Sequence, residues 1–141
     1  MTGMEQASCV RVAARSQALA DQMFAVPDSG RVDRRARRVA RRLCDSCPVR
    51  DLCLSEALAR RTRDNVLAGG LTYQERCVLS HEIAADLGVT LWGLASVSPS
   101  TVLAWLREHP RAVERARSCT RAYWRDRKRS SSAALAQGRL F

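Results

Sequence analysis

Three cysteines lie close together in the chain, at Cys44, Cys47 and Cys53. The first two are separated by two residues, a spacing that lets both sulfur atoms turn toward one metal ion or one edge of a cluster. The third follows six residues later, close enough to return to the same place after one or two helical turns. Zinc and iron–sulfur centres commonly take four thiolates, so a fourth ligand has to come from elsewhere in the chain.

Two further cysteines, Cys9 and Cys77, are candidates for that fourth position. Cys119 has no second ligand near it in sequence, and we expect it to be a small buried hydrophobic residue. The spacing does not choose between tetrahedral zinc and an iron–sulfur cluster. The two-residue spacing also occurs in thiol–disulfide reductases, although thioredoxin-type activity sits on a strand-rich fold that this sequence does not indicate.

The absence of a signal peptide argues against a disulfide framework. The first residues lack a basic start, and Arg11 and Arg15 interrupt the apolar positions that follow. No run approaches the roughly 20 apolar residues of a membrane span. We therefore expect a cytoplasmic protein with reduced thiols and no membrane partner.

The net charge of +10 and the pI of about 10.6 favour a polyanionic partner, with nucleic acid ahead of a membrane surface. No nucleophile elbow, phosphate-binding loop or histidine-containing metal motif is present. We therefore predict that the protein is not an enzyme, has no catalytic residues and has no small-molecule substrate.

Helical periodicity dominates the chain. A helix is expected near Val12 to Phe24, followed by a break at Pro27–Gly30. From Val32 an apolar face is predicted to contain Val32, Ala36, Val39, Ala40 and Leu43. Six arginines cover the rest of that helix; they either stabilise a negatively charged cluster or form a solvated or phosphate-facing surface.

The glycine pair that follows is expected to turn tightly near the cysteines. A short helix is predicted after Pro48, and a polar turn at Arg60–Asn65 leads into Val66–Gly70. Gly69 and Gly70 permit a turn that approaches a cluster closely, because glycine adopts backbone conformations closed to other residues.

These motifs together resemble the WhiB-like family of actinobacterial and actinophage transcription factors. The resemblance rests on Cys9, on C-D-S-C-P-V-R-D-L-C-L at residues 44–54, and on V-L-A-G-G-L-T followed by Glu75 and Arg76. Met23-Phe24 and Pro27 are similar to the family's aromatic-proline element. The match covers residues 9 to 76, about half of the chain.

The resemblance implies a 4Fe-4S cluster held by Cys9, Cys44, Cys47 and Cys53, with Cys77 as the rival to Cys9 and zinc as the alternative metal. It also implies sensitivity to oxygen or nitric oxide, and binding to DNA and to the C-terminal region of the principal RNA polymerase sigma factor. The partner-binding turn is then formed by Leu67, Ala68, Gly69 and Gly70.

Two departures from the family pattern affect these expectations. Ala68 replaces the tryptophan usual before the glycine pair, so sigma binding is expected to be weaker or to use Trp92 or Phe24 instead. The gap from Cys9 to Cys44 is also long for the family, which an insertion between Cys9 and Met23 would explain.

A second motif lies in the C-terminal half. A helix from Gln74 to Leu87, a short one at Leu91–Ala95 and a capped one from Pro99 to Leu106 resemble a helix-turn-helix; the alternative is an ordinary helical hairpin. DNA contacts are predicted from the start of the last helix and from the basic segment after it, at Ser100, Thr101, Arg107, Arg121, Arg125, Arg127, Lys128 and Arg129. His81 and His109 are expected at the surface or at a helix cap.

The sequence thus predicts an all-α fold: a small helical bundle around a four-cysteine iron–sulfur cluster, with a basic helical C-terminal extension. We expect a cluster-binding domain at 1–76, a basic DNA-binding extension at 77–129 and a flexible tail at 130–141. The predicted function is transcriptional regulation. The alternatives are a zinc-stabilised DNA-binding protein without redox sensing and a thiol–disulfide reductase.

Overall fold

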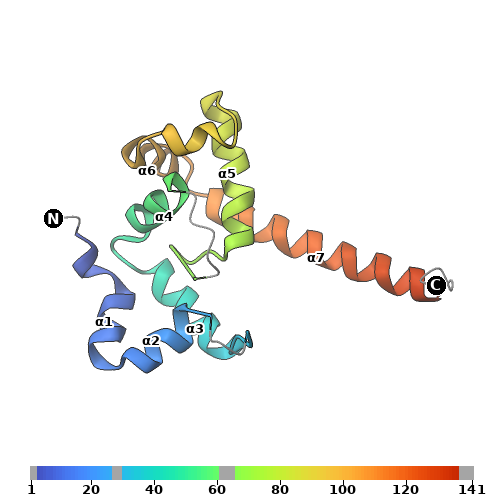
Figure 1. The fold of residues 1–141 in the computed structure, drawn as a ribbon, viewed down its shortest axis with the longest axis horizontal. Helices are drawn as coiled ribbons and strands as arrows, with labels where there is room; N and C mark the ends of the chain where they lie inside the picture. Colours follow the sequence, from blue (N-terminus) through green and yellow to red (C-terminus); the bar gives the residue numbers. More distant parts are fainter. Residues whose placement is uncertain (1–2, 27–29, 61–65, 137–141) are drawn as a thin grey trace.

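The computed structural model describes residues 3–26, 30–60 and 66–136. Within these ranges the fold is all-α, as predicted, and an isolated bridge between Ala68 and Leu71 is the only β pairing. The elements in chain order are η1 (Met4–Gln6), α1 (Ser8–Arg15), α2 (Gln17–Phe24), α3 (Arg34–Asp45), α4 (Arg50–Ala59), α5 (Tyr73–Leu87), η2 (Gly93–Ser96), α6 (Pro99–Glu108) and α7 (Ala112–Ala136) (Figure 1).

The N-terminal segment forms two helices where one was predicted. Ser16 has an extended backbone between α1 and α2, and its hydroxyl accepts a hydrogen bond from Leu19 N at 3.2 Å. A serine oxygen in this position satisfies a donor that the first turn of a helix leaves unpaired. The chain therefore stops and restarts at Ser16.

The predicted inner face of α3 is partly wrong. Ala40 is buried, but Val39 is 42% exposed, whereas Arg37 is 8% exposed. The Arg37 guanidinium donates to the carbonyl oxygens of Phe24 at 3.4 Å and Ala25 at 2.8 Å. Because the last carbonyls of a helix lack intrahelical partners, this arginine is buried to satisfy the end of α2.

The C-terminal helices follow their sequence signals closely. Thr72 and Glu75 form a capping box at the start of α5, and Gly88 ends it with a φ of 68°. Ser98 caps α6, and Pro99 takes its first position, as predicted. Trp105 is an additional core residue of α6; its ring nitrogen donates to Asp86 at 2.9 Å.

Two apolar cores hold these helices together. Helices α1, α2 and α3 enclose the N-terminal core, which consists of Ala20, Met23, Phe24, Ala40 and Leu67. Helices α4 to α7 enclose a larger core that includes Leu54, Leu71, Leu79, Ile83, Val102, Trp105 and Ala116.

Helix α7 joins the body only through its first half. It runs antiparallel to α5: Arg115 pairs with Glu82, and Trp124 donates to Gln74 at 3.0 Å. The remainder projects away from the body (Figure 1). The tail predicted from Ser130 is helical as far as Ala136.

Residues 27–29 and 61–65, which carry most of two predicted breaks, lie outside the described residues, as do 137–141. The predicted domain boundary after residue 76 falls inside α5. None of the described helices is long and apolar enough to cross a membrane.

Candidate metal centre

Four cysteines come to the region between the two cores from different elements. Cys9 lies in the first turn of α1, Cys44 near the end of α3, Cys47 in the turn after α3 and Cys53 in α4. Cys9 and Cys44 pack against the N-terminal core. Cys53 precedes Leu54, a fully buried residue of the larger core. This region therefore lies where the two cores adjoin.

The thiols influence one another electrostatically. Burial, with smaller contributions from the charges of Cys53, Cys9 and Cys47, raises the pKa of Cys44 to about 12, although a backbone hydrogen bond from Gly70 acts to lower it. Burial likewise raises the pKa of Cys53, with added contributions from Cys9 and Cys47. Cys9 acts on the pKa of both Cys44 and Cys53 and packs against the same core as Cys44, so it lies in the same region as the other three.

The pKa of Cys47 is lowered instead. Burial acts to raise its pKa, but backbone hydrogen bonds from Ser8 and Val49 and the charge of Arg11 leave the pKa below its usual value. The Ser8 amide at the start of α1 donates to Cys47 Sγ at 3.4 Å. A helix N-terminus stabilises negative charge, so this contact favours a Cys47 thiolate.

The glycine pair forms the wall of the centre. The backbone amides of Gly69 and Gly70 act as hydrogen-bond donors to Cys53 and Cys44, lowering the pKa of each thiol against its burial. Both glycines have positive φ, 57° and 80°. A Cβ on Gly69 would lie 2.7 Å from Leu54 Cβ, which explains why no side chain fits in this turn.

Arg117 connects α7 to this wall. Its guanidinium donates to Asp45, the residue after Cys44, at 2.9 and 3.2 Å, and to the Gly70 carbonyl at 2.8 Å. Burial alone would lower the pKa of Arg117, but the hydrogen bond and charge of Asp45 raise it above its usual value. Sequence analysis missed this residue, because its partners lie far away in the chain.

Cys77 and Cys119 lie elsewhere. They line one groove between α5 and α7, together with His81 and Tyr123. Neither thiol is among the main causes of the pKa shifts of Cys44 and Cys53. The structure therefore groups Cys9, rather than Cys77, with the three clustered cysteines. Cys119 is exposed, so its predicted role as a buried hydrophobe is wrong.

The donor set fits a soft metal group. Among the described residues, no three Cys, His, Asp or Glu side chains are close enough as they stand to hold a single metal ion. Four thiols are the donor chemistry that both a tetrahedral zinc ion and an iron–sulfur cluster take, so this set of residues suits either group. The amide donors facing Cys44 and Cys53 suit thiolates in either case.

The predicted partner-binding turn is mostly inaccessible. Leu67, Gly69 and Gly70 are buried, and Ala68 is the half-buried member. Of the two predicted substitute anchors, Phe24 is 7% exposed and lies in the N-terminal core, so it is excluded. Trp92 is 70% exposed and lies immediately before η2.

The predicted DNA-reading helix exists, but its partner helix differs. Leu91–Ala95 was expected as a short helix, and the structure has the four-residue η2 at Gly93–Ser96. A helix-turn-helix needs two helices joined by a three- to four-residue turn, whereas α5 and α6 are separated by the whole segment 88–98. Helix α6 instead packs against α4.

The predicted DNA-contacting residues are solvent-accessible. Ser100 and Thr101 are exposed at the start of α6, and both hydroxyls lie within hydrogen-bond distance of Ser98 Oγ. Arg107 is exposed and lines a groove with the loop from Asp45 to Leu52. The remaining predicted contacts are exposed along α7, at Arg121, Arg125, Arg127, Lys128 and Arg129. His81 is exposed, and His109 caps α6, as predicted.

These features define a small all-α protein with a cysteine-lined centre and a projecting basic helix. A family model described as transcription factor WhiB matches residues 4–79, more than half of the chain. The chain therefore belongs to the WhiB family of transcription factors. No curated protein and no solved structure matches it.

Proposed function

We propose that this protein is an iron–sulfur transcriptional regulator whose 4Fe-4S cluster is held by Cys9, Cys44, Cys47 and Cys53. The observation that carries the proposal is the convergence of these four thiols from α1, α3, the turn after α3, and α4. Family membership adds the role in transcription. When bound, such a cluster supplies one-electron chemistry and reactivity toward oxygen or nitric oxide.

The chain's own residues prepare the site for negative charge. The amides of Ser8, Gly69 and Gly70 face three of the sulfurs. Arg76 adds positive charge that lowers the pKa of Cys53. Hydrogen bonds and charges near the sulfurs tune cluster potentials, so these groups favour thiolate ligation and a raised potential.

DNA and the C-terminal region of the principal sigma factor are the proposed partners. The basic face of α7 supports DNA binding, because each neutralised phosphate releases counterions. Trp92 supports protein binding, because exposed aromatic residues commonly anchor interfaces. Arg117 of α7 contacts Asp45 and Gly70 beside the cysteine centre, so a structural change at that centre would reach α7 through these two residues.

Anaerobic purification with metal analysis tests the cofactor. We expect brown protein with iron and sulfide in equal amounts and broad visible absorption. Colourless protein with bound zinc would instead support a zinc-stabilised DNA-binding module. Metal-free protein that catalyses disulfide reduction would support a thiol–disulfide reductase. Either of these two results contradicts the iron–sulfur proposal.

A further inference from the structure

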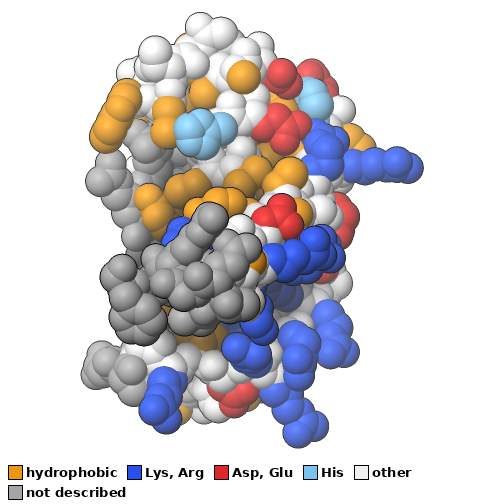
Figure 2. All heavy atoms as spheres, turned by 90° about the vertical axis from the view of Figure 1, so that its right-hand side faces the viewer, with side chains coloured by type: hydrophobic (Ala, Val, Ile, Leu, Met, Phe, Trp, Pro, Cys, Tyr) orange, Lys and Arg blue, Asp and Glu red, His pale blue; other side chains and the backbone are white. Residues whose placement is uncertain are grey.

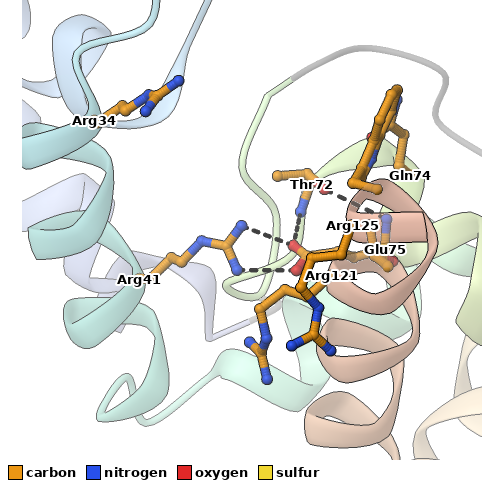
Figure 3. Close-up of a pocket in the computed structure, with 9 residues that line it drawn as sticks. Arg34, Arg41, Thr72, Gln74, Glu75, Arg121 and Arg125 are labelled. Carbon is orange, nitrogen blue, oxygen red and sulfur yellow. Dashed lines mark hydrogen bonds and ion pairs between the residues drawn. The ribbon is translucent and has the colours of Figure 1, made fainter. Parts of the chain in front are cut away.

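A basic groove lies between the cysteine-bearing half of the molecule and α7. It has a volume of about 680 Å³. Arg34 and Arg41 line it from α3, and Arg121 and Arg125 line it from α7 (Figure 3). Thr72, Gln74 and Glu75 form the floor at the start of α5, so that a single carboxylate faces four guanidinium groups.

The walls of this α3–α7 groove are fixed by contacts that leave most of its charge available. Arg41 forms two 3.0 Å contacts with Glu75, which also accepts from Thr72 N at 2.9 Å. This ion pair neutralises Arg41 and holds α3 against α5. On the other side, Trp124 donates to Gln74 at 3.0 Å and holds α7 in place.

The remaining cations are weakly compensated. Arg121 contacts Glu114 at 3.3 Å, but both side chains are largely exposed, and such surface pairs contribute little. Arg34 and Arg125 are exposed. Like charges on opposite walls repel each other, and an anion between them relieves that repulsion.

The charge continues beyond the groove. Arg121, Arg125 and Lys128 recur at helical spacing and so share one face of α7. Lys and Arg side chains gather toward the lower right of the face from which α7 projects, whereas His side chains lie in its upper part (Figure 2). From Arg121 to Arg129 the cations extend over about 12 Å of helix at 1.5 Å per residue. A cationic track of this length suits a linear polyanion better than a small anion.

We propose that the α3–α7 groove holds a segment of DNA phosphate backbone, so that α3 is part of the DNA interface. This inference rests on the proposed DNA-binding function of α7 and extends the contact to the cysteine-bearing half. Arg34 contacts the backbone from one wall, and Arg121 and Arg125 contact it from the other. Helix α3, which carries Cys44 near its far end, then touches DNA directly.

Arg34 and Arg35 offer a matched test. Both are exposed in the first turn of α3, but only Arg34 lines the groove. Binding of the full-length holoprotein to duplex DNA is measured for Arg34→Gln and Arg35→Gln over a range of salt concentrations. We expect Arg34→Gln to weaken binding and to reduce the log–log salt slope by about 0.9, the value of one lost phosphate contact. Arg35→Gln should retain the wild-type slope.

Arg125→Gln separates this inference from the proposed function. A reduced slope for Arg125→Gln with a wild-type slope for Arg34→Gln overturns the groove and leaves DNA binding by α7. Wild-type slopes for both variants contradict both proposals. An acidic peptide is the other possible occupant of the groove, and poly-glutamate tests it. If poly-glutamate binds the wild-type protein as tightly as a DNA duplex of equal charge, and Arg34→Gln weakens both equally, the groove is an acidic-peptide site. That result would overturn the inference.

Discussion

Arg117 and Asp45 are 72 positions apart in sequence and form a bidentate ion pair, with Nη2–Oδ1 at 2.9 Å and Nη1–Oδ2 at 3.2 Å. The same Nη2 donates to the Gly70 carbonyl at 2.8 Å. One buried guanidinium thus connects α7, the end of α3 and the glycine turn.

Loss of the Arg117 side chain should destabilise the protein. Arg117→Gln is expected to lower the free energy of unfolding by about 2 kcal/mol, because charged hydrogen bonds in a mostly buried position are lost. Arg115 lies two residues before Arg117 and forms a more exposed ion pair with Glu82. Arg115→Gln should therefore cost less than about 1 kcal/mol. Urea unfolding of both variants measures the difference. Equal losses of unfolding free energy in the two variants would show that the contacts of Arg117 stabilise the protein no more than the exposed Arg115–Glu82 pair does.

The glycine turn should tolerate no side chain. A Cβ on Gly70 would lie 2.6 Å from Arg117 Nη2 and 3.2 Å from Cys44 Cβ, whereas one on Gly88 would meet nothing within 4 Å. Both glycines have positive φ, so Gly88→Ala reports backbone strain alone, about 1 kcal/mol. Gly70→Ala should cost about 3 kcal/mol, because overpacking is added.

Thermal unfolding and metal content of the two alanine variants check this expectation. Gly70→Ala should also bind less iron, since the amide that faces Cys44 is displaced. A Gly70→Ala protein as stable and as metal-rich as Gly88→Ala would mean that the turn does not shape the centre.

Local signals allowed the C-terminal helices to be predicted. The Thr72–Glu75 box, Gly88 and the Ser98-Pro99 pair each act within one helical turn, so their consequences can be read from neighbouring residues. The three clustered cysteines were predictable for the same reason. Their spacing within ten positions is a local signal of the same kind, and their role as ligands stays a prediction.

Contacts between distant segments could not be predicted. Arg37 was assigned to the surface because it is charged, but the carbonyls at the end of α2 draw it inside. Arg117 appeared as one of many basic residues, and nothing near it in sequence indicates Asp45 as its partner. The placement of Cys9 near Cys44 was expected from the family resemblance alone, because it depends on how α1 packs against α3.

Sigma-factor binding should depend on Trp92. Because Ala68 lacks an aromatic ring and Phe24 is buried, Trp92 is the expected anchor, and Trp92→Ala should weaken binding by about 2 kcal/mol. Ala68→Trp should strengthen binding if the glycine turn also faces the partner. Titration of the holoprotein with the sigma C-terminal region measures both, with the exposed Tyr123→Ala as control. Unchanged affinity for Trp92→Ala would exclude this surface.

The ligand set is tested most directly by the iron content of cysteine variants purified without oxygen. Cys44→Ser, Cys47→Ser and Cys53→Ser should each lose the cluster and much of the folded structure, because metal binding contributes folding energy in so small a core. Cys119→Ser should retain both.

The comparison of Cys9→Ser with Cys77→Ser is decisive for the arrangement described here, in which Cys9 lies with the clustered thiols and Cys77 lies beside Cys119. We expect Cys9→Ser to lose iron and visible absorption, whereas Cys77→Ser should keep both at the wild-type level. Full iron content in Cys9→Ser together with its loss in Cys77→Ser would contradict it.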